Sequence, residues 1–343
     1  MRFLLDDERR EFARSLDAML TAADTPGAVR AWAAGDTAPG RALWTRLADA
    51  GVFALAVPER HDGLGPLPVD TTVAFTELGR HAVPGPLVET VAAAALLDRL
   101  GDAGAATLLP QIAGGKAVVS LCVPALGGPY ALDPDAADAV LVVEGDAVRL
   151  AETTGPVQRS ADPARRLARP LGGTVLARGP VVTAATAHAA DVAALATAAQ
   201  SLGLGRALLD RTVAYVRQRT QFGVAIGSFQ AVKHRLADTL IALEFAQPLL
   251  YSAALALARG ADRASAEVAA AKVTAGEASY AAARTALQLH GAVGYTEELD
   301  LALWIRKARP LRDAWGTPAV CRARVVEACD RPGVPPTTTG AEA

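Results

Sequence analysis

The feature that most constrains the fold of this sequence is a set of long, weakly charged helical segments between about residues 186 and 330. In the second segment the apolar residues step by three or four positions, at Phe229, Val232, Leu236, Leu240 and Leu243. In the third, the same period links Val268, Ala271, Ala275, Ala278, Ala282, Thr285 and Leu289. This is the helical period. Because alanine-rich faces let helices approach closely, the pattern predicts a helical bundle that also forms a subunit interface.

Two segments with different residue patterns precede this bundle. Residues 1–115 alternate Ala- and Leu-rich helical segments with turns such as VPERHDGLGPLP, whose prolines and glycines forbid a continuous helix. From about 117 to 183 the chain changes to short β-branched runs, and the letters EGD between two of them predict a hairpin turn. The predicted fold class is therefore α+β, in four parts: an N-terminal helical domain (1–115), a small middle β domain (116–184), a C-terminal four-helix bundle (185–330) and a disordered tail (331–343).

The composition excludes several classes of protein. Hydrophobic residues make up 51% of the 343 positions, enough for a large core, and 34 Lys and Arg nearly balance 36 Asp and Glu. The net charge of the protein therefore creates no electrostatic field that would favour binding to nucleic acid or to an anionic membrane. The N-terminus lacks the layout of a secretory signal, and no uncharged apolar run is long enough to span a bilayer. We therefore expect a cytoplasmic protein with no nucleic-acid or membrane partner.

The spacing of cysteines and histidines indicates no metal site. Cys122, Cys321 and Cys329 are odd in number and form no C-x-x-C pair, so ordinary reduced thiols are expected. The five histidines are scattered without the spacing of metal ligands, at His61, His81, His188, His234 and His290. The sequence therefore predicts a protein without a bound metal.

A first candidate for chemistry is the stretch RQRTQFGVAIGSFQAVKHRLAD. Arg219, Gln221 and Phe222 precede a glycine, and Ser228 is a candidate N-cap for the helix that follows. Unpaired N–H groups at a helix start favour negative charge, and a guanidinium can clamp a phosphate with two hydrogen bonds. The alternative is a plain turn with a buried phenylalanine.

A second candidate is ALQLHGAVGYTEE, at the end of the third long helical segment. Gly291 and Gly294 permit close approach of a ligand to the backbone, and Gln288 supplies an amide in the last helical turn. The alternative is an ordinary glycine cap at the helix end.

Taken together, these stretches resemble the acyl-CoA dehydrogenase family. The shared features are the domain order, RTQFG, SFQAVKHRLAD, QLHGAVGYTEE and a closing GT, with WTRLADAGVFALAVPERHDGLG and FTELGRHAVPGP in the N-terminal part. The resemblance implies FAD as cofactor and an acyl-CoA thioester as substrate. It also implies α,β-dehydrogenation, in which a base removes the α-proton while a hydride passes from the β-carbon to the flavin.

The resemblance also implies which residues bind the cofactor. In this family the RxQFG arginine and aromatic residue, together with the glutamine and glycines of QLHG, reach across a dimer interface to the adenosine-diphosphate half of a neighbour's FAD. The cofactor-binding residues implied here are Arg219, Gln221, Phe222, Phe229, Gln230, Gln288, Leu289, Gly291, Gly294 and Thr317.

The general base is missing from its usual place. In the family an aromatic residue and a catalytic glutamate precede Gly-Thr, and here Trp315 stands in the glutamate's position. A tryptophan has no proton-accepting group. Some relatives carry the glutamate on the first long C-terminal helix, near Ala193, where Asp191 is the nearest carboxylate. Asp191 is a candidate base, but two residues along a helix is a different face, so a helix N-cap or solvated charge is the alternative. We expect Trp315 to pack where a lost cleft has closed.

The middle of the chain departs from the family as well. A TEP…GSD-like loop that contacts the flavin ring is replaced by CVPALGGPYALDP, and the β region is short. We therefore expect a partner subunit lacking the base, as in the α2β2 heterotetramers of actinobacterial sterol side-chain breakdown, paired with a second acyl-CoA dehydrogenase-like chain or with itself in a tetramer. The alternatives are a self-sufficient homo-oligomeric dehydrogenase or secondary-metabolism flavoenzyme with an unrecognised base, and a non-catalytic helical scaffold.

Overall fold

The computed structural model describes residues 5–101 and 103–330. Helices fill its N-terminal part, as the turn pattern predicted. Their bounds are α1 (Asp7–Thr21), α2 (Thr25–Ala34), α3 (Ala38–Asp49), α4 (Pro68–Arg80), α5 (Leu87–Leu100) and α6 (Ala103–Ala113), with short 3₁₀ turns η1 (Ala54–Ala56) and η2 (Glu59–His61). The predicted disordered tail, 331–343, lies outside the described residues.

Helix α5 is the buried centre of the N-terminal part. Every residue from Leu87 to Leu97 is buried, because α6, α8 and strand β1 cover its faces. Its sequence, LVETVAAAALL, is apolar all round, which is typical of a core helix rather than a surface one. One carboxylate, that of Glu89, is nevertheless buried in this helix and is only 5% exposed.

The β region forms a small mixed sheet of strands β1 (Val119–Cys122), β3 (Ala139–Glu144), β4 (Ala147–Leu150) and β8 (Thr174–Arg178), in the order β1-β3-β4-β8. β1 and β3 are parallel, and the other pairs are antiparallel. The EGD turn is confirmed, since Glu144 pairs with Ala147 across it. Short pairs extend the region: β2 (Ala131–Leu132) with β6 (Leu167–Ala168), and β5 (Thr153–Thr154) with β7 (Pro170–Leu171); one-turn α7 (Pro124–Gly127) follows β1.

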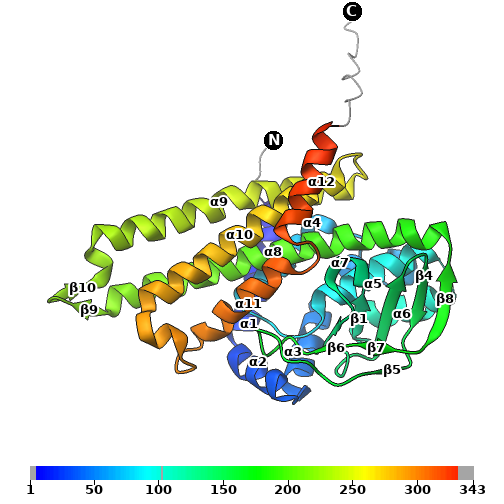
Figure 1. Cartoon of the computed structure of the whole chain (residues 1–343), viewed down its shortest axis with the longest axis horizontal. Helices are drawn as coiled ribbons and strands as arrows, with labels where there is room; N and C mark the ends of the chain where they lie inside the picture. Colours follow the sequence, from blue (N-terminus) through cyan, green and yellow to red (C-terminus); the bar gives the residue numbers. More distant parts are fainter. Residues whose placement is uncertain (1–4, 102, 331–343) are drawn as a thin grey trace, which may run out of the picture.

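The C-terminal part consists of α8 (Pro180–Gln218), α9 (Gln230–Ala258), α10 (Ala264–His290), α11 (Leu301–Asp313) and α12 (Pro318–Asp330), with 3₁₀ turns η3 (Ile226–Ser228) and η4 (Gly291–Tyr295). The three long helices are confirmed, although α8 begins at Pro180, ahead of the expected start near 186, because proline suits the first helical position. Helices α8, α9 and α10 run side by side, the hairpin of β9 (Thr220–Gln221) and β10 (Val224–Ala225) projects at one end, and the sheet lies towards the other end of α8 (Figure 1).

Small residues set how closely α4 and α8 cross. A Cβ placed on Gly203 would lie 1.8 Å from the carbonyl oxygen of Thr76, and one on Gly79 would lie 2.1 Å from that of Gln200. No side chain fits at either distance, so glycine on both helices brings the two backbones into contact. This crossing locks the N-terminal helices onto the bundle.

Helices α8 and α9 are each long and apolar enough, by length and composition alone, to cross a membrane. This differs from the expectation based on uncharged runs, because both helices continue through isolated charged residues. More than half of the most apolar window of α8 is buried inside the protein, as in any core helix. The corresponding window of α9 is only 28% buried, and its exposed side chains include Leu240, Ile241, Phe245 and Leu249. These four residues form an unpaired apolar face, as expected of a subunit interface.

Candidate active site

The hairpin after α8 presents an exposed aromatic residue. Phe222 and Gly223 occupy its turn with φ values of 52° and 78°, the left-handed conformation that glycine tolerates best. Phe222 is 93% exposed and meets the ring of Phe229 edge-on at 6.3 Å. The alternative of a turn with a buried phenylalanine is therefore wrong. Arg219, Gln221 and Gln230 are exposed around the same hairpin.

Ser228 does not cap helix α9, so this prediction is wrong. Ser228 lies in the preceding 3₁₀ turn, where its hydroxyl donates to the carbonyl of Ala225, and the N-cap position belongs to Phe229. The side chain of Phe229 cannot accept a hydrogen bond from the first turn of α9. Main-chain N–H groups at the helix start are therefore not capped by a side chain, which suits an anionic ligand.

The two sequence stretches meet at one end of the bundle. The ring of Tyr215, in the last turn of α8, stacks on the ring of His290, the last residue of α10, with centroids 4.0 Å apart. Gln288 is exposed nearby and accepts a hydrogen bond from Arg235 of α9. Gly291 ends α10 with a φ of 64°, and a Cβ there would meet nothing within 4 Å. The expected glycine cap and an open surface for a ligand thus coexist.

Three of the predicted cofactor-binding residues are not exposed beside the hairpin and the end of α10. Leu289 is half-buried, and Gly294 is buried against His290, so both contribute to packing. Thr317 lies just before α12, next to Gly316, whose carbonyl accepts from Lys272 in the third turn of α10. Gln288 is sixteen residues further along α10, about 24 Å away. The fold therefore does not bring Thr317 to the hairpin within one protomer.

Asp191 is neither a helix cap nor a solvated charge. It lies within α8, and its Oδ1 accepts a hydrogen bond from the Ser265 hydroxyl at 3.0 Å and lies 3.8 Å from a guanidinium nitrogen of Arg324. Burial raises the pKa of Asp191, and both of these partners oppose the rise. These contacts point Asp191 towards α10 and α12, so the structure does not bring it to the cavity that Trp315 lines.

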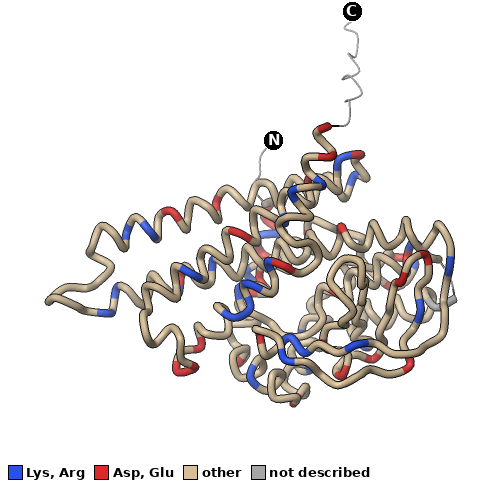
Figure 2. Tube along the Cα trace, in the orientation of Figure 1, with Lys and Arg blue, Asp and Glu red and all other residues tan. Residues whose placement is uncertain are grey.

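That cavity, of about 320 Å³, lies between the β region, α5 and the end of α11. The CVPALGGPYALDP segment forms one wall through Cys122, Tyr130 and their neighbours. Arg165 and Arg309 contribute positive charge to the lining, and Lys and Arg positions gather along α11 (Figure 2). Trp315 packs against the hydrophobic core as expected, but a cavity remains beside it, so the expectation of a closed cleft is wrong.

Trp315 and Glu89 meet in the wall of this cavity. The indole Nε1 of Trp315 donates to Oε1 of Glu89 at 3.0 Å, across 226 residues of sequence. Burial raises the pKa of the Glu89 carboxyl, while Arg165 and the Trp315 hydrogen bond oppose the rise. Sequence reasoning missed Glu89, and the signal was available: a single carboxylate in the apolar run LVETVAAAALL.

A narrow second cavity continues behind Glu89 and Trp315, where further charged groups are buried. Burial raises the pKa of Asp133 to about 7, while the Arg166 main chain, which donates to its Oδ1, and the indole of Trp32 oppose the rise. Lys307 lies 3.3 Å from Asp162 and pairs with it. The inner wall of the site is thus a set of desolvated charges rather than a plain apolar core.

The residues present fit FAD as two separate groups, one that suits the diphosphate and one that suits a smaller moiety. An arginine, two amides and uncapped N–H groups suit the diphosphate of FAD, but they lie on an exposed hairpin. The cavity at Trp315 is at the lower limit of ligand-site volumes, enough for a ring or an acyl group rather than a whole dinucleotide. The Trp315 turn in its wall is contacted by Lys272, about 24 Å along α10 from Gln288, so the two groups of residues lie far apart within one protomer.

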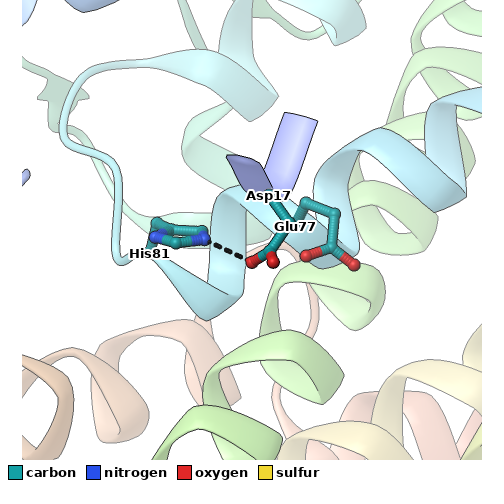
Figure 3. A group of neighbouring side chains, drawn as sticks. All are labelled: Asp17, Glu77 and His81. Atoms are coloured by element: carbon teal, nitrogen blue, oxygen red, sulfur yellow. Dashed lines mark hydrogen bonds and ion pairs between the residues drawn. The ribbon is translucent and has the colours of Figure 1, made fainter. Parts of the chain in front are cut away.

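Outside this region, the structure brings His81 together with Asp17 and Glu77 (Figure 3). Their ligand atoms all lie within 4.8 Å of one another, a juxtaposition that histidine spacing did not predict. His81 Nε2 lies 2.8 Å from Asp17, and Arg80 lies 3.5 Å from Glu77. Burial, with help from Asp17, raises the pKa of Glu77 to about 7. A hydrogen bond between His81 and Asp17 and the contact of Arg80 with Glu77 give each of the three side chains a partner within the protein.

The chain belongs to the acyl-CoA dehydrogenase family. The model described as "Acyl-CoA dehydrogenase, N-terminal domain" matches residues 6–116, and "Acyl-CoA dehydrogenase, C-terminal domain" matches residues 183–329. The cofactor is accordingly FAD, and the class of chemistry is oxidoreduction of acyl-CoA.

Among curated proteins, the chain is 35% identical to acyl-CoA dehydrogenase IpdE2 of Mycobacterium tuberculosis, over 88% of this chain and 91% of the relative. Among solved structures, a variant of the Tcur3481-Tcur3483 steroid ACAD superposes with a TM-score of 0.81 at 25% identity, covering 94% of this chain and 98% of that one. The ChsE4-ChsE5 complex from Mycobacterium tuberculosis also gives 0.81, at 24% identity over 97% of this chain and all of the other, and shows the shared fold.

Proposed function

We propose that this chain is one subunit of a heteromeric acyl-CoA dehydrogenase. In that assembly its hairpin and the end of α10 bind the adenosine-diphosphate half of a FAD whose ring lies in the neighbouring chain, and the neighbour supplies the base for that site. The observation that carries the proposal is the separation of the two halves: Gln288 lies about 24 Å along α10 from Lys272, which contacts the Trp315 turn.

The surfaces of the chain support an assembly. Phe222 is almost fully exposed on a projecting hairpin, where a lone monomer gains nothing from a large aromatic side chain. The apolar face of α9, formed by Leu240, Ile241, Phe245 and Leu249, is exposed in the same protomer. Burying both against other chains removes this apolar area from water and covers the hairpin that binds the diphosphate.

The names of the relatives support a heteromer that acts on a large substrate. The Tcur3481-Tcur3483 relative is a steroid ACAD named for two components, and the ChsE4-ChsE5 relative is a complex of two. A thioester of a steroid-derived acid is accordingly the substrate class we propose. FAD supplies the hydride acceptor, while this chain positions the diphosphate through Arg219 and the start of α9.

The test is to isolate the chain from its natural host with an affinity tag and to identify the chain that co-purifies with it. Each chain is then purified alone and the two are mixed with FAD. We expect a colourless chain that retains stoichiometric FAD, and turns over acyl-CoA in a dye-coupled assay, only when mixed with its partner. A yellow, active protein on its own would establish the self-sufficient enzyme, and a protein colourless in every mixture would establish the scaffold.

A further inference from the structure

We propose that Glu89 is a catalytic residue in this chain's own cavity, where its carboxylate accepts the α-proton of a bound acyl-CoA thioester. The inference goes beyond the proposed function, in which the base for the shared flavin belongs to the neighbouring chain, and rests on it only for the class of substrate. It gives this chain a working proton-transfer site of its own.

Glu89 is distinguished by its position from the other carboxylates near the cavity. It lines both the 320 Å³ cavity and the narrow space behind it. Asp133 lines only the narrow space, and Asp162 is held by Lys307. Asp313 reaches the cavity from the last residue of α11 and is half-buried, so water competes for it. Glu89 is the desolvated carboxylate that faces the larger space.

The contact with Trp315 places the Glu89 carboxylate where the reaction of this family needs it. The indole Nε1 of tryptophan and the carboxylate oxygens of glutamate stand the same number of bonds from their Cα atoms. Oε1 of Glu89 is 3.0 Å from that nitrogen. A carboxylate from α5 therefore lies beside the spot that a glutamate at position 315 would reach.

Packing alone does not account for a carboxylate at this position. Glu89 is followed by eight buried residues of α5, and an apolar side chain would fill its place without desolvating a charge. Arg165, which lines both spaces, stabilises the ionised form of Glu89. A carboxylate kept in a cavity at this energetic cost is the pattern of a functional group.

The proton-transfer step is balanced within the site. The bond between Cα and its hydrogen breaks, the proton binds to a Glu89 carboxylate oxygen, and the electron pair stays on the substrate as the thioester enolate. Arg165, on the cavity wall, supplies positive charge against the developing anion. In the reverse step Glu89 returns a proton to the α-carbon, so the cycle needs no oxidant.

The charged neighbours set the pH range of this step. Burial moves the pKa of Glu89 upwards, while Arg165, the Trp315 hydrogen bond and Lys307 of α11 move it down. The negative charge of Glu89 in turn contributes to the raised pKa of Asp133, which lies behind it. A raised pKa makes the ionised carboxylate of Glu89 a stronger proton acceptor than an ordinary glutamate.

The experiment measures deuterium incorporation at C2 of two acyl-CoA probes, butanoyl-CoA and 3-cyclohexylpropanoyl-CoA, in D₂O by mass spectrometry. The full chain is used without added FAD, so the readout does not depend on the flavin. We expect exchange above the buffer blank that falls by roughly 10²–10⁴-fold in Glu89→Gln, the usual contribution of a general base. Glu89→Asp should retain partial exchange. Glu77→Gln, which removes a half-buried carboxylate that does not line the cavity, is the matched control and should exchange like wild type.

A second variant separates catalysis from packing. Trp315→Phe keeps an aromatic ring but removes the N–H donor to Glu89, so the pH profile of exchange should shift to higher pH while the melting curve stays cooperative. Absence of wild-type exchange with both probes would overturn the proposal, as would unchanged exchange in Glu89→Gln. Loss of exchange in Asp313→Asn, together with unchanged exchange in Glu89→Gln, would identify Asp313 as the base. Because flavin retention and exchange are measured separately, exchange without FAD binding in any mixture would refute the proposed function alone.

Discussion

The ammonium nitrogen of Lys272 lies 2.8 Å from the main-chain carbonyl oxygen of Arg312. The same Nζ also donates to the carbonyls of Leu311 and Gly316. Lys272 is buried on α10, and burial lowers its pKa to about 8. It satisfies carbonyls at the end of α11 that would otherwise lack partners. The turn that follows, with Trp315 at a φ of 53°, is therefore fixed by a residue more than forty positions earlier.

Replacing Lys272 with Met should destabilise the protein by about 2–3 kcal/mol, because buried carbonyl oxygens lose their donor while the side-chain volume is kept. Urea denaturation measures the change. The exposed Lys233→Met on α9 is the control and should leave the midpoint unchanged. Equal stability of Lys272→Met and wild type would show that the turn is held by other contacts.

Arg219→Ala should weaken FAD retention by the assembled protein without unfolding it. Loss of a charge-assisted hydrogen bond to phosphate costs about 1.5–3 kcal/mol, or roughly ten- to hundredfold in affinity. Flavin content after dialysis against limiting FAD is the measurement. Arg217→Ala, an exposed arginine in the last turn of α8, controls for a general loss of positive charge. Equal flavin loss in both variants would contradict a specific role for Arg219.

Truncating Trp315 tests its part in the cavity wall. Trp315 is half-buried, so Trp315→Ala should cost about 2–3 kcal/mol, below the range for a fully buried tryptophan. The same change opens the 320 Å³ cavity into the narrow space behind it, since Trp315 lines both. Thermal unfolding and the affinities for small and bulky acyl-CoAs are the readouts. A loss above 5 kcal/mol would mean that packing dominates its role.

Introducing Trp315→Glu should create a coupled pair of carboxylates. The new side chain would face Glu89, and two carboxylates that share a desolvated site hold a proton between them. We therefore expect the variant to be markedly more stable at pH 5 than at pH 8, relative to wild type. Melting temperatures across this range measure the effect. A pH-independent difference would show that the two carboxylates do not meet.

Glu77 gives a prediction for pH dependence at the cluster with Asp17 and His81. Its folded pKa of about 7 lies above the ordinary value of 4.5, so the folded state holds a proton that the unfolded state has lost between these pH values. The stabilisation is complete below about pH 4.5 and is lost as pH rises through 7, by about 3 kcal/mol. The glutamine of Glu77→Gln does not titrate, so the stability of this variant relative to wild type should rise over this pH range.

Urea unfolding of wild type and Glu77→Gln at pH 5 and pH 8 measures this difference. Glu8→Gln, at an exposed position on α1, is the control and should track wild type at both pH values. A constant gap between Glu77→Gln and wild type would contradict the shifted titration.

The sequence by itself determined the architecture and the family. Three long segments carry apolar residues at every third or fourth position. Such segments require long helices, since only a helix places these positions on one face. The EGD turn and the RTQFG and QLHG motifs are local signals, because a turn or a helix end depends on a few consecutive residues. The cytoplasmic location and the cofactor residues stay predictions of the same kind, drawn from short patterns.

Only the tertiary structure decided what surrounds those motifs. Ser228 has the chemistry of a cap, but the 3₁₀ turn ends after it and leaves Phe229 in that position. Asp191 is bound by groups on α10 and α12, which no count along α8 reveals. Glu89 of α5 accepts a hydrogen bond from Trp315, which follows α11 and is 226 residues away in the sequence. Burial and hydrogen bonding between distant segments depend on how helices pack, and a single sequence encodes that packing only through the sum of its weak contacts.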